Sequence, residues 1–179
     1  LSENWLIVIG LFMGGSWLAN KWVLEPGNIR KQYLGLFSYA FFQAIIFLPM
    51  IVYLLTSDRF YEEVKDIIAQ AGIVSLGLFT GLSAVAMFSK KDFSFLRSIL
   101  TIGFGIALAL IIASLLIGFD LGLAFSGAMV FLAGGSILYQ TSRLVHDYHA
   151  NQHVAAALSL FASFMLLFYY ILQIFMSRD

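Results

Sequence analysis

The 179-residue chain contains no cysteine. Without a thiol it can build no disulfide framework, no thiolate zinc site, no iron–sulfur cluster and no cysteine nucleophile. Charged residues are also scarce, at 11% of the sequence, and ten Lys and Arg residues balance ten Asp and Glu residues. This balance argues against a nucleic-acid binder, which needs a basic face. We expect no cofactor and no nucleic-acid partner.

Hydrophobic residues are in excess, at 61% of the chain with a mean hydropathy of +0.91. A soluble domain is on average under about half apolar and about a quarter charged. A chain this short cannot bury the excess in one core, because much of its surface stays on the outside. The remaining apolar surface must face lipid, so the composition predicts a polytopic membrane protein.

Six apolar stretches are long enough for a helix that crosses the hydrocarbon layer, which needs about 20 residues. Their apolar character is nearly continuous, whereas the strands of a membrane barrel alternate polar and apolar residues. The sequence therefore predicts an all-α membrane protein, a bundle of six transmembrane helices in which residues 1–179 form a single domain. The predicted spans are residues 5–24, 33–56, 67–88, 95–118, 121–144 and 154–176.

The charges predict the orientation of the bundle, because Lys and Arg accumulate on the cytoplasmic side of a membrane. One side holds seven basic residues: Lys21, Arg30, Lys31, Lys90, Lys91, Arg97 and Arg143. The other side holds three: Arg59, Lys65 and Arg178. The first side is predicted to be cytoplasmic, which places both ends of the chain outside. Since the chain begins at Leu1 without a methionine, we expect one earlier span, and seven in the natural protein.

The middles of the predicted spans lack Asp, Glu, Lys and Arg, which proton relays and catalytic carboxylate pairs require. The polar residues at depth are neutral amides and hydroxyls, which usually form hydrogen bonds between helices. Alternatively, some of them line a polar track for small ions, opened or closed by a kink at Pro49. The candidates for this track are Gln43, Gln70, Gln140 and Ser163.

Three histidines form the one cluster that could belong to an enzyme. His146, His149 and His153 are three and four residues apart, a spacing that aligns side chains on one helical face. The spacing allows a metal site, but the polar segment around the histidines favours a solvated turn at the end of a span. We expect no catalytic, cofactor or metal site.

Two local patterns predict packing and a turn. Gly10 with Gly14, and Gly77 with Gly81, have the small-residue spacing that lets membrane helices approach closely. The segment Lys90-Lys91-Asp92 is predicted to be a tight cytoplasmic turn, since cations favour the C-terminal end of a helix. Asp92, followed by Ser94, is predicted to cap the next helix.

Three segments carry a resemblance to a known family. Residues 78–96 comprise the end of the third predicted span, which contains Thr, Phe and Ser, and the turn Lys-Lys-Asp-Phe-Ser-Phe that follows it. Residues 136–146 read Ser-Ile-Leu-Tyr-Gln-Thr-Ser-Arg-Leu-Val-His, and residues 156–161 read Ala-Ala-Leu-Ser-Leu-Phe. These segments resemble the Bax inhibitor-1 (TMBIM) family, and in particular its bacterial YccA-type members. The resemblance covers residues 67–179 well and the first two spans loosely.

The resemblance implies a seven-helix bundle with no established enzymatic chemistry. Some members of the family are described as pH-sensitive calcium leak channels, gated by a pair of intramembrane aspartates. The corresponding positions here are Gln140 and Ser163, which cannot titrate. A proton- or calcium-leak pathway is therefore the alternative function and not the leading one.

The leading function comes from the YccA-type members. The resemblance implies a bacterial inner-membrane protein that modulates an FtsH-type membrane AAA+ protease or a related stress-response assembly. The implied partners are the protease or its HflK/HflC-like scaffold, and the C-terminus is then periplasmic. Candidate cytoplasmic contacts are Lys90, Lys91, Asp92, Arg143 and His146.

Overall fold

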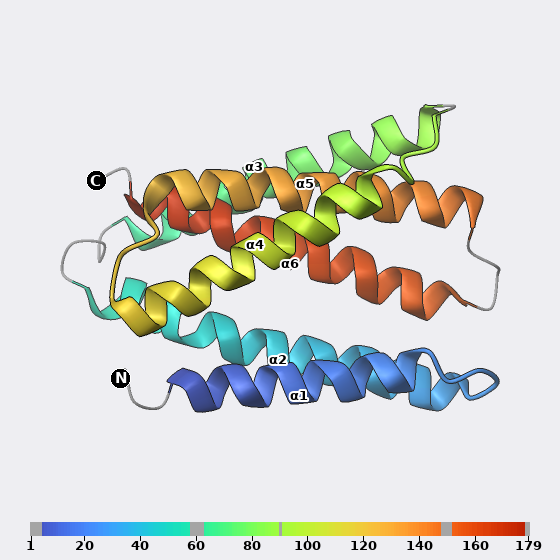
Figure 1. Cartoon of the computed structure of the whole chain (residues 1–179), viewed down its shortest axis with the longest axis horizontal. Coiled ribbons are helices and arrows are strands. Elements are labelled where there is room, and N and C mark those ends of the chain that lie inside the picture. The colour runs from blue at the N-terminus through green and yellow to red at the C-terminus, as the bar shows by residue number, and fades with distance from the viewer. Residues whose placement is uncertain (1–4, 58–62, 90, 148–151, 178–179) are drawn as a thin grey trace. The chain divides into compact units, whose positions relative to one another are not determined.

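The computed structural model describes residues 5–57, 63–89, 91–147 and 152–177, which form six helices and contain no strand (Figure 1). This confirms the all-helical fold predicted from the sequence. The expected seventh helix remains a prediction, and so does the grouping of residues 1–179 into a single bundle. The helices are α1 (Trp5–Val23), α2 (Ile29–Thr56), α3 (Val64–Phe88), α4 (Leu96–Ile117), α5 (Gly122–His146) and α6 (His153–Ser177).

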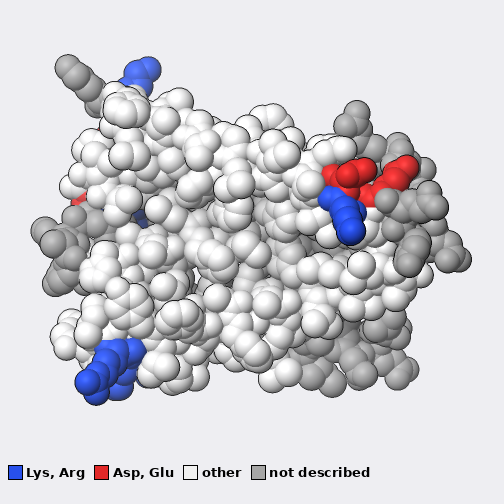
Figure 2. Space-filling model, turned by 180° about the vertical axis from the view of Figure 1, so that it is seen from behind, with Lys and Arg blue, Asp and Glu red and all other residues white. Residues whose placement is uncertain are grey.

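Five helices, α2 to α6, are long and apolar enough to cross a membrane. Large apolar side chains are exposed along them, including Phe88 at 85% and Phe131 at 84%. Such surfaces are rare on soluble monomers, and most of the face in Figure 2 carries neither acidic nor basic side chains. The chain is therefore a multi-pass membrane protein. Helix α1 has 19 residues, and its crossing of the membrane stays a prediction.

Helix α2 begins four residues before the predicted span, at Ile29 instead of residue 33. Asn28 is the N-cap, and its side-chain oxygen accepts a hydrogen bond from the backbone N–H of Lys31 at 3.2 Å. This bond satisfies one of the free N–H groups of the first turn. The apolar run did not reveal this start, because the first turn is polar. At its other end α2 continues through Pro49 to Thr56.

The chain divides into two compact units. The first contains α1, α2 and the first turns of α6. In it the backbones of α1 and α2 approach closely at Gly35, where an added Cβ would lie 2.6 Å from the carbonyl oxygen of Ala19. The ring of Phe12 packs against Tyr39 with centroids 6.3 Å apart.

The second unit contains α3, α4, α5 and the rest of α6. Helix α5 contacts the other three helices of this unit. An added Cβ at Gly134 would lie 3.2 Å from Leu82 on α3, and one at Gly135 would lie 3.2 Å from Leu100 on α4. Towards α6, the ring of Phe125 packs edge-on against Tyr170, with centroids 5.9 Å apart.

The glycines predicted to allow close packing do not do so within the described chain. An added Cβ at Gly10, Gly14, Gly77 or Gly81 would meet no atom within 4 Å. The prediction was wrong because a spacing of four places two glycines on one face without determining which face meets a neighbour.

Candidate functional site

The candidate functional site is the polar face of α5. Four of its buried residues carry hydroxyl groups, and each bonds to another element of the second unit, whereas most side chains of α5 are apolar. A buried hydroxyl without a partner is costly in an apolar environment. The four residues are Ser126, Ser136, Thr141 and Ser142.

Two of the hydrogen bonds join α5 to α6. Ser136 Oγ and Ser163 Oγ lie 2.8 Å apart, and the two side chains are 8% and 6% exposed. Nearer the start of α5, Ser126 Oγ donates to Gln173 Oε1 at 3.1 Å. Each pair satisfies polar atoms that lipid could not, so these contacts determine the register of the two helices.

The other two bonds tie the C-terminal end of α5 to α3 and to the segment that follows α3. Thr141 Oγ1 donates to Ser83 Oγ at 3.3 Å. The backbone N–H of Phe93 donates to Ser142 Oγ, also at 3.3 Å. One turn later, His146 Nδ1 donates to the carbonyl oxygen of Ser142 at 2.9 Å. The connection between α3 and α4 is thus attached to the end of α5.

That connection has its own internal hydrogen bonds around Asp92. The backbone N–H of Ser94 donates to Asp92 Oδ1 at 2.9 Å, and the Ser94 hydroxyl donates to the same oxygen. The side-chain and backbone hydrogen bonds from Ser94 lower the pKa of the Asp92 carboxyl, and the charge of His146 contributes to the lowering. Asp92 therefore presents a stable negative charge at neutral pH.

The prediction that Asp92 and Ser94 cap the next helix was wrong. The N-cap of α4 is Phe95, which makes no side-chain capping bond. Asp92 instead bonds to the backbone two residues ahead, within the connection, as short Asp side chains commonly do in turns. The hydrogen bonds between Asp92 and Ser94 form in the predicted turn, but helix α4 starts beyond both residues, at Leu96.

Arg143, at the charged end of α5, contacts an acidic and an aromatic side chain. Arg143 Nε lies 3.7 Å from Asp147 Oδ2, and its guanidinium lies 5.7 Å from the centre of the Tyr139 ring. The side chains in the ion pair are 39% and 57% exposed, so solvent weakens their attraction. These contacts hold the guanidinium near the surface of the helix end.

The structure places the four candidates for a polar track differently from one another. Ser163 is paired with Ser136, and Gln70 lies on an exposed face of α3. Gln140 is partly buried on α5, and no described residue donates to its buried Oε1. Gln43 is buried in the first unit. No hydrogen bond joins any two of the four in the part of the chain that the structure describes.

The candidate cytoplasmic contact residues lie closer together than the polar-track candidates do. Lys91, Asp92 and His146 are exposed, and Arg143 is partly exposed. The bond between Ser142 and Phe93 holds the two segments that carry them together. Lys90, the fifth candidate, lies outside the described residues.

His149, one of the three histidines of the candidate metal site, lies outside the described residues. Among the residues that are described, no group of three His, Cys, Asp or Glu side chains could hold a metal ion. His146 and His153 belong to different units.

Sequence reasoning did not include Ser126, Thr141 and Ser142 in the site. A signal was available, since the buried residues of α5 recur every three or four positions, among them Ser126, Met129, Ala133, Ser136 and Ile137. Hydroxyl residues in phase with such a stripe are expected to face other helices. Residue type alone does not show whether a hydroxyl bonds to another helix or to a carbonyl of its own helix.

Five apolar helices and a buried face of paired hydroxyl and amide groups define a multi-pass α-helical membrane protein. The sequence profile of the family described as "Inhibitor of apoptosis-promoting Bax1" matches residues 3–179. The chain therefore belongs to the Bax inhibitor-1 family, which confirms the resemblance seen in the sequence.

Relatives from bacteria and yeast agree with this assignment. An uncharacterized protein of Pseudomonas aeruginosa is 37% identical over 111 residues, covering 62% of this chain and 50% of the relative. Bax inhibitor 1 of Schizosaccharomyces pombe is 28% identical over 177 residues, covering 95% of this chain and 61% of the relative. The Escherichia coli protein named "Modulator of FtsH protease YccA" is 28% identical over 177 residues, 97% of this chain and 76% of the relative. The chain thus spans about half the length of the first of these relatives.

Proposed function

We propose that this chain is a non-catalytic protein of the bacterial inner membrane that binds and modulates an FtsH-type AAA+ protease. The alternative partners are its HflK/HflC-like scaffold and a related stress-response assembly of the membrane. The observation that carries the proposal is the similarity to the Escherichia coli modulator over 177 residues. The alignment extends over nearly all of this chain, so the sequence similarity includes the segments of all six described helices.

The chemistry of the buried groups supports a binding role over a catalytic one. Among the described residues no Asp, Glu, Lys, Arg or His side chain is buried, and the buried polar groups are amides, Ser and Thr hydroxyls and the phenols of two tyrosines. General acid–base catalysis and proton relays need groups that titrate. The pairs on α5 satisfy one another, as expected for contacts that hold helices in register.

The proposed contact surface comprises Lys91 and Asp92 together with Arg143 and His146. Hydrogen bonds hold its two segments in place, so binding a partner would cost little conformational entropy. Basic residues predominate on this side of the predicted bundle, which makes it cytoplasmic and the C-terminus periplasmic. The AAA+ module of a protease that hydrolyses ATP must also be cytoplasmic.

Affinity purification from native membranes, after extraction into nanodiscs, tests the proposal. The wild-type chain should recover an FtsH-type protease, identified by mass spectrometry. Reversing two charges with Lys91→Glu and Arg143→Glu should reduce the recovered protease severalfold. The matched control is Lys65→Glu, which reverses an exposed charge at the other end of α3. No enrichment of the protease with the wild-type chain, or equal recovery with the charge-reversed variant, would refute the proposal.

A small-ion leak is the second candidate function, favoured by the buried Oε1 of Gln140, which has no described partner. Polar atoms without protein partners can be satisfied by water or an ion along a pathway. Proton and calcium flux into liposomes discriminates between the two functions. A leak predicts wild-type flux above that of empty liposomes, and a reduction with Gln140→Leu or Ser163→Leu. Flux of the wild type at the level of empty liposomes eliminates the leak.

A further inference from the structure

A cavity of about 400 Å³ lies in the first unit, where the connection from α1 to α2 meets the first turn of α6. Its volume falls in the range of pockets that hold small organic ligands. Apolar side chains from α1, the connection and α6 form much of the wall. They include Val23, Leu24, Pro26, Ile29 and Ala155.

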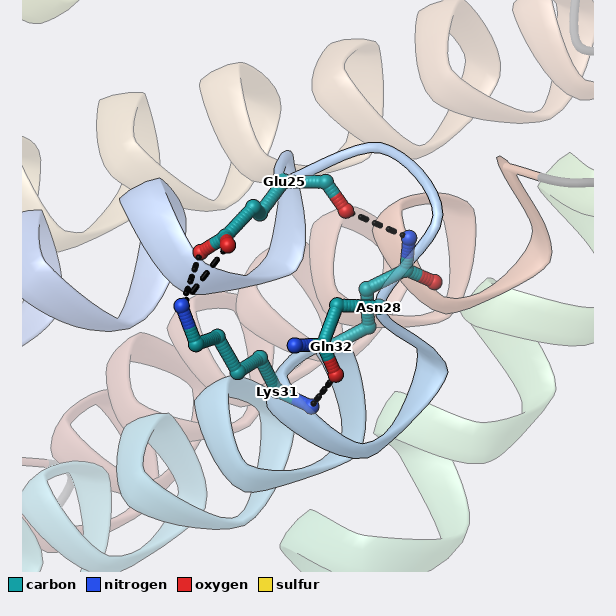
Figure 3. A network of polar contacts seen from close by, with 4 residues as sticks. All are labelled: Glu25, Asn28, Lys31 and Gln32. Carbon is teal, nitrogen blue, oxygen red and sulfur yellow. Dashed lines mark hydrogen bonds and ion pairs between the residues drawn. The ribbon is translucent and has the colours of Figure 1, made fainter.

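Gln32 brings one strong polar group to this wall. Its side chain is buried, with the residue only 8% exposed. The amide nitrogen Nε2 donates to the carbonyl oxygen of Glu25 at 2.9 Å, and this bond settles which end of the amide is the nitrogen. Figure 3 shows the amide oxygen pointing away from that carbonyl. No described residue donates to Oε1, which is a buried acceptor.

An amide oxygen in such a place needs a donor, because a buried polar group without a partner is costly. The charges around the cavity indicate what kind of donor fits. Lys31 Nζ binds the Glu25 carboxylate at 2.7 Å and 3.0 Å (Figure 3). Neither residue lines the cavity. Among the described residues, the wall itself contains no Asp, Glu, Lys or Arg. His153 also lines the wall, and an imidazole is either neutral or positive. A cationic donor would therefore lack a negative counter-charge, and a neutral donor is favoured.

The cavity also lies at the ends of helices that cross the membrane. It adjoins the first turns of α2 and α6, both of which are long and apolar enough to span a bilayer. The ends of such helices lie at the boundary between hydrocarbon and headgroups. Molecules with an apolar chain and a polar head concentrate at this boundary.

We propose that the cavity binds a neutral amphiphile through its hydroxyl group. The hydroxyl donates to Gln32 Oε1, and the adjoining carbon chain packs against Val23, Ile29 and Ala155. The amphiphile comes either from the bilayer, as a diacylglycerol-type lipid with a free hydroxyl, or from solution, as a free medium-chain alcohol. This site is independent of the proposed contact with a protease.

Photolabelling of the full chain in nanodiscs tests the site. The probe is 3-azioctanol, an octanol with a photoreactive diazirine, and its O-methyl ether serves as the control that cannot donate. Peptide mass spectrometry should find the alcohol in residues 23–29 and 152–158, and several times less of the ether. Excess 1-octanol and excess 1,2-dioctanoylglycerol are then compared as competitors. The one that displaces the probe at the lower mole fraction identifies the source.

Two variants test the mechanism. Gln32→Met removes the acceptor and should lower labelling about fivefold, the effect of losing one hydrogen bond. Ala155→Leu fills the cavity from α6 without touching the amide, and should lower labelling as well. The control is Gln43→Met, on the same helix and also 8% exposed, which should label like the wild type.

Several outcomes would overturn the site. Equal labelling by the alcohol and the ether would show that no hydrogen bond is formed. Unchanged labelling in a folded Gln32→Met protein would have the same meaning. If Gln32→Met does not fold, the labelling of Ala155→Leu is the test, and labelling of that variant at the wild-type level overturns the proposal. Failure of both competitors to displace the probe would leave only non-specific labelling.

Discussion

Ser136 Oγ on α5 and Ser163 Oγ on α6 lie within hydrogen-bond distance, 2.8 Å apart and both buried. Either hydroxyl can donate to the other. The pair occupies the part of the second unit where neither lipid nor a charged group satisfies these atoms. Removal of one partner leaves the other buried and unpaired, which makes the two residues energetically dependent on each other.

We expect Ser136→Ala and Ser163→Ala each to lower the free energy of unfolding by about 0.6 to 1.7 kcal/mol. The double variant should lose less than the sum of the two, because the second change removes an atom that already lacks its partner. Reversible unfolding in mixed micelles measures these values. Ser159→Ala is the control, since its hydroxyl donates within its own helix, to the carbonyl of Ala155. Strict additivity in the double variant would contradict the pairing.

Gly35→Ala should destabilise the first unit by about 1 to 3 kcal/mol. The added Cβ would lie 2.6 Å from the carbonyl oxygen of Ala19 and 3.0 Å from the backbone nitrogen of Val23. Backbone atoms cannot rotate away as a side chain can, so α1 and α2 must separate. The midpoint of thermal unfolding in nanodiscs reports the change.

Gly14→Ala is the matched control for Gly35, because an added Cβ at Gly14 meets no atom within 4 Å. Alanine favours a helix over glycine by about 1 kcal/mol, so this variant should unfold at the same temperature as the wild type or higher. A loss of stability at Gly14 equal to that at Gly35 would argue against the close approach at Gly35.

Gln140→Met should leave the free energy of unfolding unchanged or raise it by about 1 kcal/mol, because it removes a buried acceptor with no described donor. Gln173→Met provides the comparison on α6, since it removes an oxygen that accepts from Ser126. That variant should lower the free energy of unfolding. Equal effects of the two substitutions, measured by unfolding in the same micelles, would mean that Gln140 does have a partner.

The connection between α3 and α4 should respond to acid through Asp92. Hydrogen bonds from Ser94 lower the pKa of this carboxyl below its ordinary value of 3.8. The stabilising contribution is therefore present above the ordinary value, and it is lost as the pH falls through the lowered pKa. In Ser94→Ala the pKa of Asp92 should rise towards the ordinary value. Carboxyl chemical shifts followed by NMR in micelles measure both titrations, and identical midpoints would contradict the role of Ser94.

The apolar runs predicted the positions of the helices well, because a helix that crosses a membrane is apolar over nearly its whole length. Residues 121–144 were predicted as a span and α5 covers Gly122–His146. The start of a helix in polar sequence was harder to predict. Helix α2 starts at Ile29 because Asn28 caps it, and capping does not depend on hydropathy. The cap of α4 was missed for a related reason. Asp92 can bond to the connection or to the helix with similar geometry, and only the path of the backbone selects one.

The sequence by itself determined the class of this protein and its family. The apolar excess, with no charged residue in the middles of the predicted spans, indicates a protein surrounded by lipid, and the motifs in residues 78–96 and 136–146 identify the family. Only the tertiary structure decided which neutral polar groups meet. Gln140 and Ser136 lie four residues apart on one helix, yet Ser136 is paired and Gln140 Oε1 has no described partner. A hydrogen bond requires a second atom at about 3 Å, and whether α6 supplies that atom depends on how the two helices pack.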